Sequence, residues 1–124
     1  MMAADIEISA SWAEHVVQLA PNDCWPWSGP LLENDYGRTK VKIDGRWRTA
    51  GAHQVAYYLA TGRWERRADG RMVRHLCHFR RCCNPAHLRG GTALDNANDR
   101  ADRRMGIDLL TRPIWVLPVS GLAQ

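Results

Sequence analysis

The stretch RHLCHFRRCCNPAHLRGGTALDNANDR, residues 74–100, contains three of the chain's four cysteines and three of its five histidines. Within it, Cys77, Cys82 and His87 have the spacing C-x4-C-x4-H. Thiolates combined with imidazole are typical ligands of tetrahedral zinc. Cys24, far upstream in CWPWSG, could supply a fourth ligand. Because a closed Cys3His site is structural, we predict a zinc ion that holds an otherwise irregular loop.

Cys83 is an alternative ligand to Cys82, because C-x5-C-x3-H is also a feasible spacing. The Asn84-Pro85 pair that follows predicts a turn that presents one of the two cysteines. Packing as small reduced hydrophobic side chains would be the simpler interpretation, but clustering with histidine favours zinc. The first 17 residues contain acids and no Lys or Arg, so we expect neither an export signal nor a disulfide-forming compartment.

Charge is distributed unevenly along the 124 residues, a length that predicts one domain. Residues 1–35 contain six acids and no Lys or Arg, a net −6, whereas residues 36–124 carry a net +10. Fifteen of the 17 basic residues are Arg, which binds phosphate with a planar, two-pronged group. This density predicts a nucleic-acid partner rather than only a solubilising surface. No run approaches the ~20 apolar residues of a membrane span, so no membrane partner is expected.

Residues 1–22 are expected to form an acidic helical segment. Ser11 with Glu14 three residues later is the pattern of a capping box, and Pro21 predicts the end of that helix. Residues 36–50 read as a basic hairpin with its turn at Asp44-Gly45.

Two hairpin registers are open. A two-residue loop would pair Ile43 with Arg46, and a three-residue loop would pair Ile43 with Trp47 and Lys42 with Arg48. We favour the second, because it keeps the charged side chains on one face of the strand pair. Trp47 is then expected to pack with Trp25 and Trp27 around the zinc region.

The second half of the chain reads as alternating elements. AHQVAYYLATG predicts a helix that Gly62 stops, and GRMVRHLC a short strand. Residues 78–91 look like an irregular loop, after which Thr92 caps a helix with Asp95 at its third position. The tail, 105–124, is apolar and is expected to pack on the body or on a second copy, which would give a homodimer.

His75 and Asn96 are the candidates for chemistry. On an extended strand, residues 75 and 77 point to the same side, so His75 would be held near the zinc loop without being a ligand. A neutral imidazole can deprotonate water, and an amide oxygen can hold a hard divalent cation. Taken alone, a strand-end histidine is more often structural and an asparagine in a first helical turn is more often a cap.

The sequence resembles the HNH, or His-Me finger, endonucleases, with their ββα-metal core, and within them the phage HNH and His-Cys box homing enzymes. The resemblance covers about residues 23–100 and rests on HLCHFRRCCNPAHLRGGTALDN, together with CWPWSG and GAHQVAYYLATG. It implies that His75 is the general base and that Asn96 holds a catalytic Mg²⁺ or Mn²⁺. It also implies a structural Zn²⁺ bound by Cys24, Cys77, Cys82 and His87, with Cys83 in the core. Some relatives carry an acidic metal ligand just before the base, where this chain has Arg74.

The family's hairpin enters a DNA groove, and by this likeness five basic residues are expected to contact DNA: Arg38, Lys40, Lys42, Arg46 and Arg48. Arg46 or Arg48 could also reach the phosphate that is cut. The alternative for all five is a solvated face.

The resulting expectation is a small α+β, zinc-stabilised ββα-metal domain, with an N-terminal basic hairpin and flanking helices. The nuclease domain would span 23–104, with its core at 71–104. It would be a metal-dependent endonuclease acting on double-stranded DNA in the cytoplasm of a bacterial or phage-infected cell. The alternative is a non-catalytic zinc module that binds DNA and derives from such a nuclease.

Overall fold

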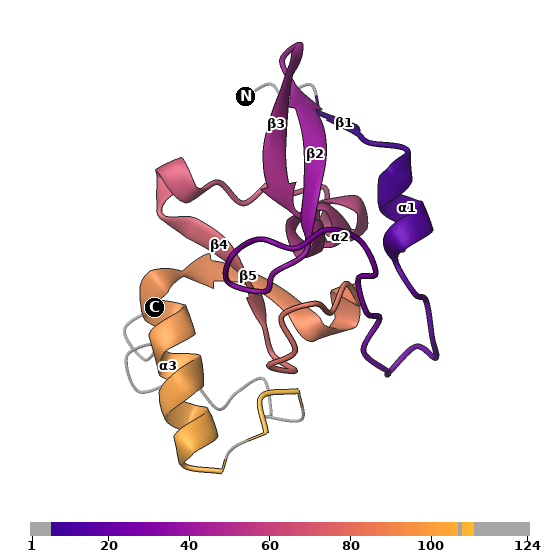
Figure 1. Ribbon diagram of the computed structural model, residues 1–124. Coiled ribbons are helices and arrows are strands. Elements are labelled where there is room, and N and C mark those ends of the chain that lie inside the picture. The colour runs from indigo at the N-terminus through magenta and orange to yellow at the C-terminus, as the bar shows by residue number, and fades with distance from the viewer. Residues whose placement is uncertain (1–5, 107, 111–124) are drawn as a thin grey trace.

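The computed structural model describes residues 6–106 and 108–110, and these form a small α+β domain (Figure 1). A three-stranded antiparallel sheet has the order β1-β2-β3, and a second sheet is the pair β4-β5. In chain order, the strands and α-helices are β1 (Ile6–Ile8), α1 (Ser11–His15), β2 (Arg38–Ile43), β3 (Arg46–Gly51), α2 (Ala52–Thr61), β4 (Arg71–His75), β5 (Leu88–Thr92) and α3 (Ala93–Arg104). Two short 3-10 helices, Arg67–Asp69 (η1) and Pro85–His87 (η2), precede β4 and β5.

The hairpin β2-β3 adopts the tighter of the two registers, so the favoured three-residue loop is wrong. Ile43 pairs with Arg46 and Lys42 with Trp47. Asp44 and Gly45 have φ of 50° and 87°, the left-handed pair typical of a two-residue turn that matches strand twist. The turn therefore fixes the register, and charge does not stay on one face. Opposite residues share a face of the sheet, so Arg48 lies across from buried Val41.

The N-terminal segment differs from the expected acidic helix. Residues 6–8 form β1, which pairs with β2 through Ile6–Ile43 and Ile8–Val41. α1 covers only five residues, its N-cap is Ala10, and no side chain caps it. Ser11 instead hydrogen-bonds to Ser9, 3.0 Å between their hydroxyl oxygens, so the predicted capping box with Glu14 does not form. Pairing of the isoleucines draws residues 6–8 into the sheet, and the helix ends at His15 because Val16 pairs with Trp27 in an antiparallel bridge.

Helix α2 lies between the two sheets and contributes to both hydrophobic cores (Figure 1). Val55 packs with Val41 and Ala50 of the hairpin. Ala52 and Ala56 face the second core, which also contains Trp27, Val73, Cys83 and Leu88. Gly62 ends α2 in the left-handed conformation, φ 76°, as predicted. One helix thereby connects the hairpin to the β4-β5 pair.

Strands β4 and β5 lead directly into α3 and give the ββα arrangement (Figure 1). Thr92 and Asp95 form the predicted reciprocal cap. Residues 88–91, expected as part of an irregular loop, belong to β5 and pair with β4. The prediction for the apolar tail falls almost wholly on residues 111–124, outside the described residues. Within the described ranges, no helix is long and apolar enough to cross a membrane.

Candidate metal centre and active site

The four predicted zinc ligands come together in space. One ligand atom from each of Cys24, Cys77, Cys82 and His87 lies within 4.8 Å of the others. His87 Nδ1 is 3.5 Å from Cys24 Sγ and 3.6 Å from Cys82 Sγ. A tetrahedron with Zn–S bonds of about 2.3 Å has ligand–ligand edges of roughly 3.8 Å. The cluster therefore has the size and donor set of a closed site that could hold zinc.

Neighbouring groups orient this cluster. His87 Nε2 donates a hydrogen bond to the Asn22 carbonyl, 2.9 Å, which leaves Nδ1 free to bind a metal. Buried Asn84 donates from Nδ2 to the carbonyls of Pro21 and Asp23, 2.8 and 2.7 Å. These bonds tie the segment that carries Cys24 to the loop that carries the other ligands, although the two are about sixty positions apart.

The thiols interact strongly with one another. A hydrogen bond from Cys77 lowers the pKa of Cys82 to about 5, and the same contact raises the pKa of Cys77. Burial raises the pKa of Cys24. Neighbouring thiolates repel one another unless a cation lies between them, so this donor set fits a divalent ion. Cys83 instead packs in the core, where burial raises its pKa to about 12.

His75 is the last residue of β4, and it is held by the metal loop. Its Nε2 donates a hydrogen bond to the Cys82 carbonyl, 2.9 Å. A carbonyl can only accept, so the neutral ring carries its proton on Nε2 and its lone pair on Nδ1. Burial lowers the pKa of His75. The same-side argument for residues 75 and 77 is wrong, because β4 ends at His75 and Cys77 lies in a turn.

Two other rings pack on His75. His53 lies 4.5 Å away and Tyr36 5.4 Å away, between ring centroids, and these two also stack on each other at 5.1 Å. Burial, followed by repulsion from His75, lowers the pKa of His53 well below its ordinary value, against a hydrogen bond to the Val73 backbone. His53 is the second residue of α2. Its Nδ1 is buried and has no hydrogen-bond partner among the described residues.

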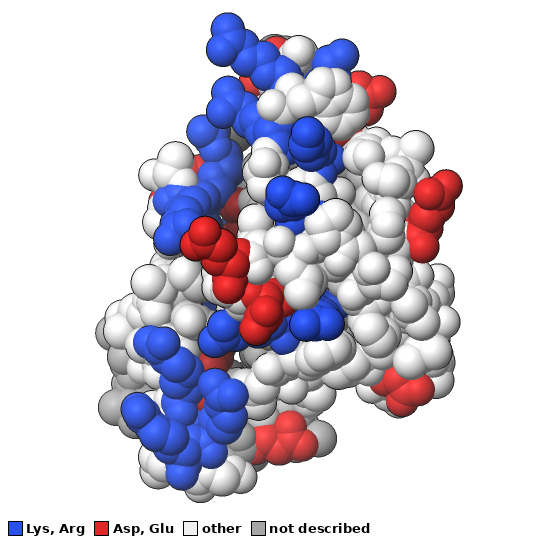
Figure 2. Space-filling view, viewed as in Figure 1, with Lys and Arg blue, Asp and Glu red and all other residues white. Residues whose placement is uncertain are grey.

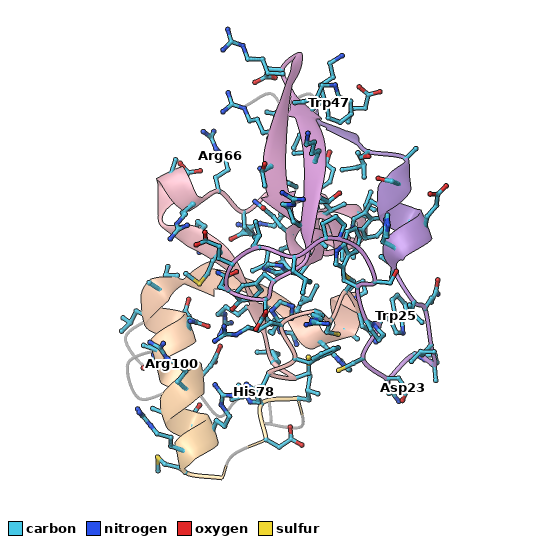
Figure 3. The ribbon with its side chains drawn as sticks, viewed as in Figure 1. Asp23, Trp25, Trp47, Arg66, His78 and Arg100 are labelled. Atoms are coloured by element: carbon cyan, nitrogen blue, oxygen red, sulfur yellow. The ribbon has the colours of Figure 1, made fainter. Side chains whose placement is uncertain are left out.

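His75 and Asn96 line one pocket of about 170 Å³. The other lining residues come from the segment before β2, the turn after β4, and α3; they are Tyr36, His78, Arg80, Asp99, Arg100 and Arg103. Figure 3 shows His78 beside α3, on which Arg100 lies. We did not predict these six residues as site residues. The spacing of Asn96, Arg100 and Arg103 along one helix face could have indicated two of them, but no sequence spacing indicates Tyr36 or Arg80.

Arg74, the residue before His75, pairs with an acid on α3. Its Nη1 is 2.6 Å from Asp99 Oδ2, and both side chains are largely buried. Asp99 lies on α3, three positions after Asn96. This ion pair joins the strand of His75 to the helix of Asn96.

The five basic residues of the hairpin lie away from this pocket. Arg38, Lys40, Arg46 and Arg48 are exposed, and half-buried Lys42 lies over the Trp47 ring, 6.0 Å from its centroid. Trp47 is exposed on the hairpin, far from Trp25 (Figure 3), so its predicted packing around the zinc region is wrong. Because neither Arg46 nor Arg48 lines the His75 pocket, the pocket's arginines come from other elements.

Residues 50–98 match the family model described as HNH endonuclease. This match supports placing the chain in the HNH endonuclease family. The matched region runs from the end of β3 into α3 and contains His75, Asn96 and three of the four clustered ligands. It does not include Cys24 or most of the basic hairpin.

A curated relative, Protein 2.8 of Escherichia phage T7, is 26% identical to this chain over 87 residues. The match covers 70% of this chain and 55% of the relative, so the chain spans about half the length of the curated relative it matches. No solved structure matches the chain significantly. The match over residues 50–98 indicates a nuclease or DNA-binding function.

Proposed function

We propose that this protein is a metal-dependent DNA endonuclease in which His75 is the general base. The observation that carries the proposal is that His75 and Asn96 line the same pocket, beside three arginines. Phosphodiester hydrolysis needs a base for water, a positive charge at the phosphate, and a means of stabilising the leaving oxygen. The pocket collects side chains for each of these requirements.

The tautomer of His75 suits it to this role. With the proton of Nε2 donated to the Cys82 carbonyl, Nδ1 is the basic atom, and among the described residues it has no hydrogen-bond partner. Burial keeps the ring neutral by lowering its pKa. The stacked rings of His53 and Tyr36 restrict how the imidazole can turn. His75 would accept a proton from water at Nδ1, while the metal loop holds the other side of the ring.

Asn96 would hold a divalent cation, Mg²⁺ or Mn²⁺, through its amide oxygen. When bound, that ion would neutralise charge on the phosphate and on the leaving oxygen. Arg80 is the pocket arginine most firmly fixed, since it donates to the Asn34 carbonyl, 2.9 Å, and lies over the Tyr36 ring. It would add a permanent positive charge near the phosphate.

The Cys24, Cys77, Cys82 and His87 cluster would hold structural zinc, and the hairpin would contribute Arg38, Lys40, Lys42, Arg46 and Arg48 to double-stranded DNA. The similarity to a phage protein supports a setting in the cytoplasm of a phage-infected bacterium. A homodimer would bring two active sites together, as the cutting of both strands needs, and the mass of the protein in solution tests for it.

Nicking of supercoiled plasmid tests the catalytic assignment. With Mg²⁺ or Mn²⁺, His75→Ala should lower the nicking rate by about 10²–10⁴-fold, the usual contribution of a general base, and retain zinc. Asn96→Ala should be similarly impaired and should respond less to added divalent ion. His78→Ala, which also lines the pocket, is the matched control and should keep most activity. Equal cleavage by His75→Ala would reject the role. A wild-type protein that binds DNA but never nicks would be the non-catalytic module.

A further inference from the structure

Hollows on one side of the molecule join into a groove that leads to the His75 pocket. The largest, about 520 Å³, lies between β3 and the η1 turn and is lined in part by Arg48, Arg66 and Arg67. It shares Gly51 and Gln54 with a second hollow of about 310 Å³. Shared lining residues mean that the two hollows adjoin.

The second hollow continues to the candidate active site. Tyr36 and Asn96 line it, and both also line the pocket of His75. At the far side of that pocket lie Arg100 and Arg103 of α3. The groove therefore has an arginine group at each end, with the base and the cation-binding amide between them.

The two arginine groups are available to a ligand. Arg66, Arg67, Arg100 and Arg103 are all exposed. Arg66 pairs with Asp69 at 3.9 Å, with both side chains 61% exposed, and such a pair is too weak to hold the guanidinium. Figure 2 shows basic side chains from the hairpin down one edge, then acidic side chains with further basic ones beside them, and then a second basic group over α3. The acidic side chains interrupt the basic surface, so we treat the two arginine groups as two phosphate sites.

We propose that the backbone of one DNA strand follows this groove across the active site. Phosphates on one side of the cut would bind Arg66 and Arg67, and phosphates on the other side would bind Arg100 and Arg103. Guanidinium groups bind phosphate oxygens in pairs and without regard to base sequence, so these contacts position the strand and do not select a target. The inference rests on the proposed function in one respect: the phosphate that is cut would lie in the middle of the groove, between the two arginine groups.

The slope of log affinity against log salt concentration is proportional to the number of DNA phosphates that a protein neutralises. We would measure the affinity of the zinc-loaded full chain for a 30-base-pair duplex of mixed sequence, without Mg²⁺, at several salt concentrations. The log–log slope should become shallower by about 2 in Arg66→Ala/Arg67→Ala, and by about 2 in Arg100→Ala/Arg103→Ala. Arg104→Ala on the same helix, and Arg89→Ala on β5, are exposed controls that line none of the groove hollows, and their slopes should not change. Unchanged slopes in the double variants, or equal losses in the controls, would overturn the groove.

Neutral methylphosphonate groups then test the path of the strand. Placed singly around a mapped nick, they should weaken wild-type binding at positions on both sides of the cut. Binding by the Arg100→Ala/Arg103→Ala variant should be insensitive to methylphosphonates on one side of the cut only. Binding by the Arg66→Ala/Arg67→Ala variant should be insensitive to those on the other side. Both variants responding to the same positions would refute the proposed path. Absence of nicking would reject the proposed activity, while the salt slopes would still decide whether the groove binds DNA.

Discussion

Adjacent cysteines show how a single side chain's direction decides its role. Cys82 belongs to the metal cluster, and its Sγ accepts a hydrogen bond from the Asn84 backbone N–H, 3.4 Å. Cys83 points the other way and packs with Trp27 and Leu88 in the core. The sequence left the choice between them open, because either spacing could bind zinc. Packing of the chain around the cluster decides it.

We expect Cys82→Ser to lose bound zinc and cooperative folding, since a structural zinc site supplies folding free energy. Cys83→Ala should keep one zinc per chain and lose only about 1–2 kcal/mol of stability, the cost of a small cavity in the core. Zinc content and thermal melting of both variants check this. Loss of zinc in Cys83→Ala with retention in Cys82→Ser would reverse the assignment.

His53 should make the folded protein sensitive to acid. Its pKa is lowered well below 6.5 by burial and by His75, so it stays neutral in the folded state while the unfolded chain takes up a proton. The unfolded state therefore binds more protons below pH 6.5, and the free energy of unfolding falls by up to about 1.4 kcal/mol per pH unit as the pH drops from there. His75 contributes in the same direction.

The variant His53→Phe keeps a ring against Tyr36 and His75 but cannot take up a proton. Its urea-unfolding free energy should depend less steeply on pH between 6.5 and 5 than that of the wild type. Zinc release at low pH affects both proteins alike, so the difference reports His53. Identical pH slopes would show that the folded-state pKa of His53 is not lowered.

Strand β4, which ends at His75, and helix α3, which carries Asn96, are joined by the ion pair of Arg74 and Asp99. Both side chains are largely buried, with 12% and 5% of the side-chain surface exposed. A buried charge without its partner is costly, whereas removing both charges is much less so. The pair accordingly positions the active site more than it adds to stability.

Asp99→Leu should lower stability by about 3–5 kcal/mol, because Arg74 remains buried and uncompensated. The double variant Arg74→Met/Asp99→Leu should recover most of that loss, and urea unfolding of the full double-mutant cycle measures the coupling. If Asp99 acts through position alone, the double variant should also regain nicking. Recovered stability without recovered nicking would instead assign Asp99 or Arg74 a direct part in the reaction.

The whole molecule depends on the metal cluster because its ligands join segments that local structure does not connect. Cys24 lies before the hairpin, while the other ligands lie between β4 and β5. The free energy of zinc binding at such sites, about 10–16 kcal/mol, equals or exceeds the stability of a typical domain. The loop between residues 76 and 84 contains no helix or strand of its own, and backbone hydrogen bonds tie it to the segment that carries Cys24: Trp27 N–H donates to the Arg81 carbonyl, 2.9 Å, and Cys83 N–H to the Trp25 carbonyl, 2.8 Å.

Removing the metal with a strong chelator should therefore unfold the chain. The far-ultraviolet circular dichroism should lose its cooperative melting transition, and an equimolar amount of Zn²⁺ should restore it. Mg²⁺ should not, since thiolates bind it poorly. A metal-free protein that melts like the loaded one would remove the structural role of the cluster.

Much of this protein follows from residues close together in sequence. The cap of α3, the end of α2 at Gly62 and the metal-ligand spacing rest on hydrogen bonds and ligand geometry that span a few positions, and the structure forms each of them. Short-range contacts of this kind depend little on the rest of the fold, so their residue types alone identify them.

Tertiary structure decided the rest. The β1 pairing replaced part of the N-terminal helix signal, and the turn conformation of Asp44-Gly45 set the hairpin register. The pocket itself draws Tyr36, Arg80 and α3 to His75 from segments far apart in the chain. Such assembly depends on which apolar surfaces bury one another, and no spacing in the sequence encodes it, because the free energy of burial is shared among contacts and is not directional.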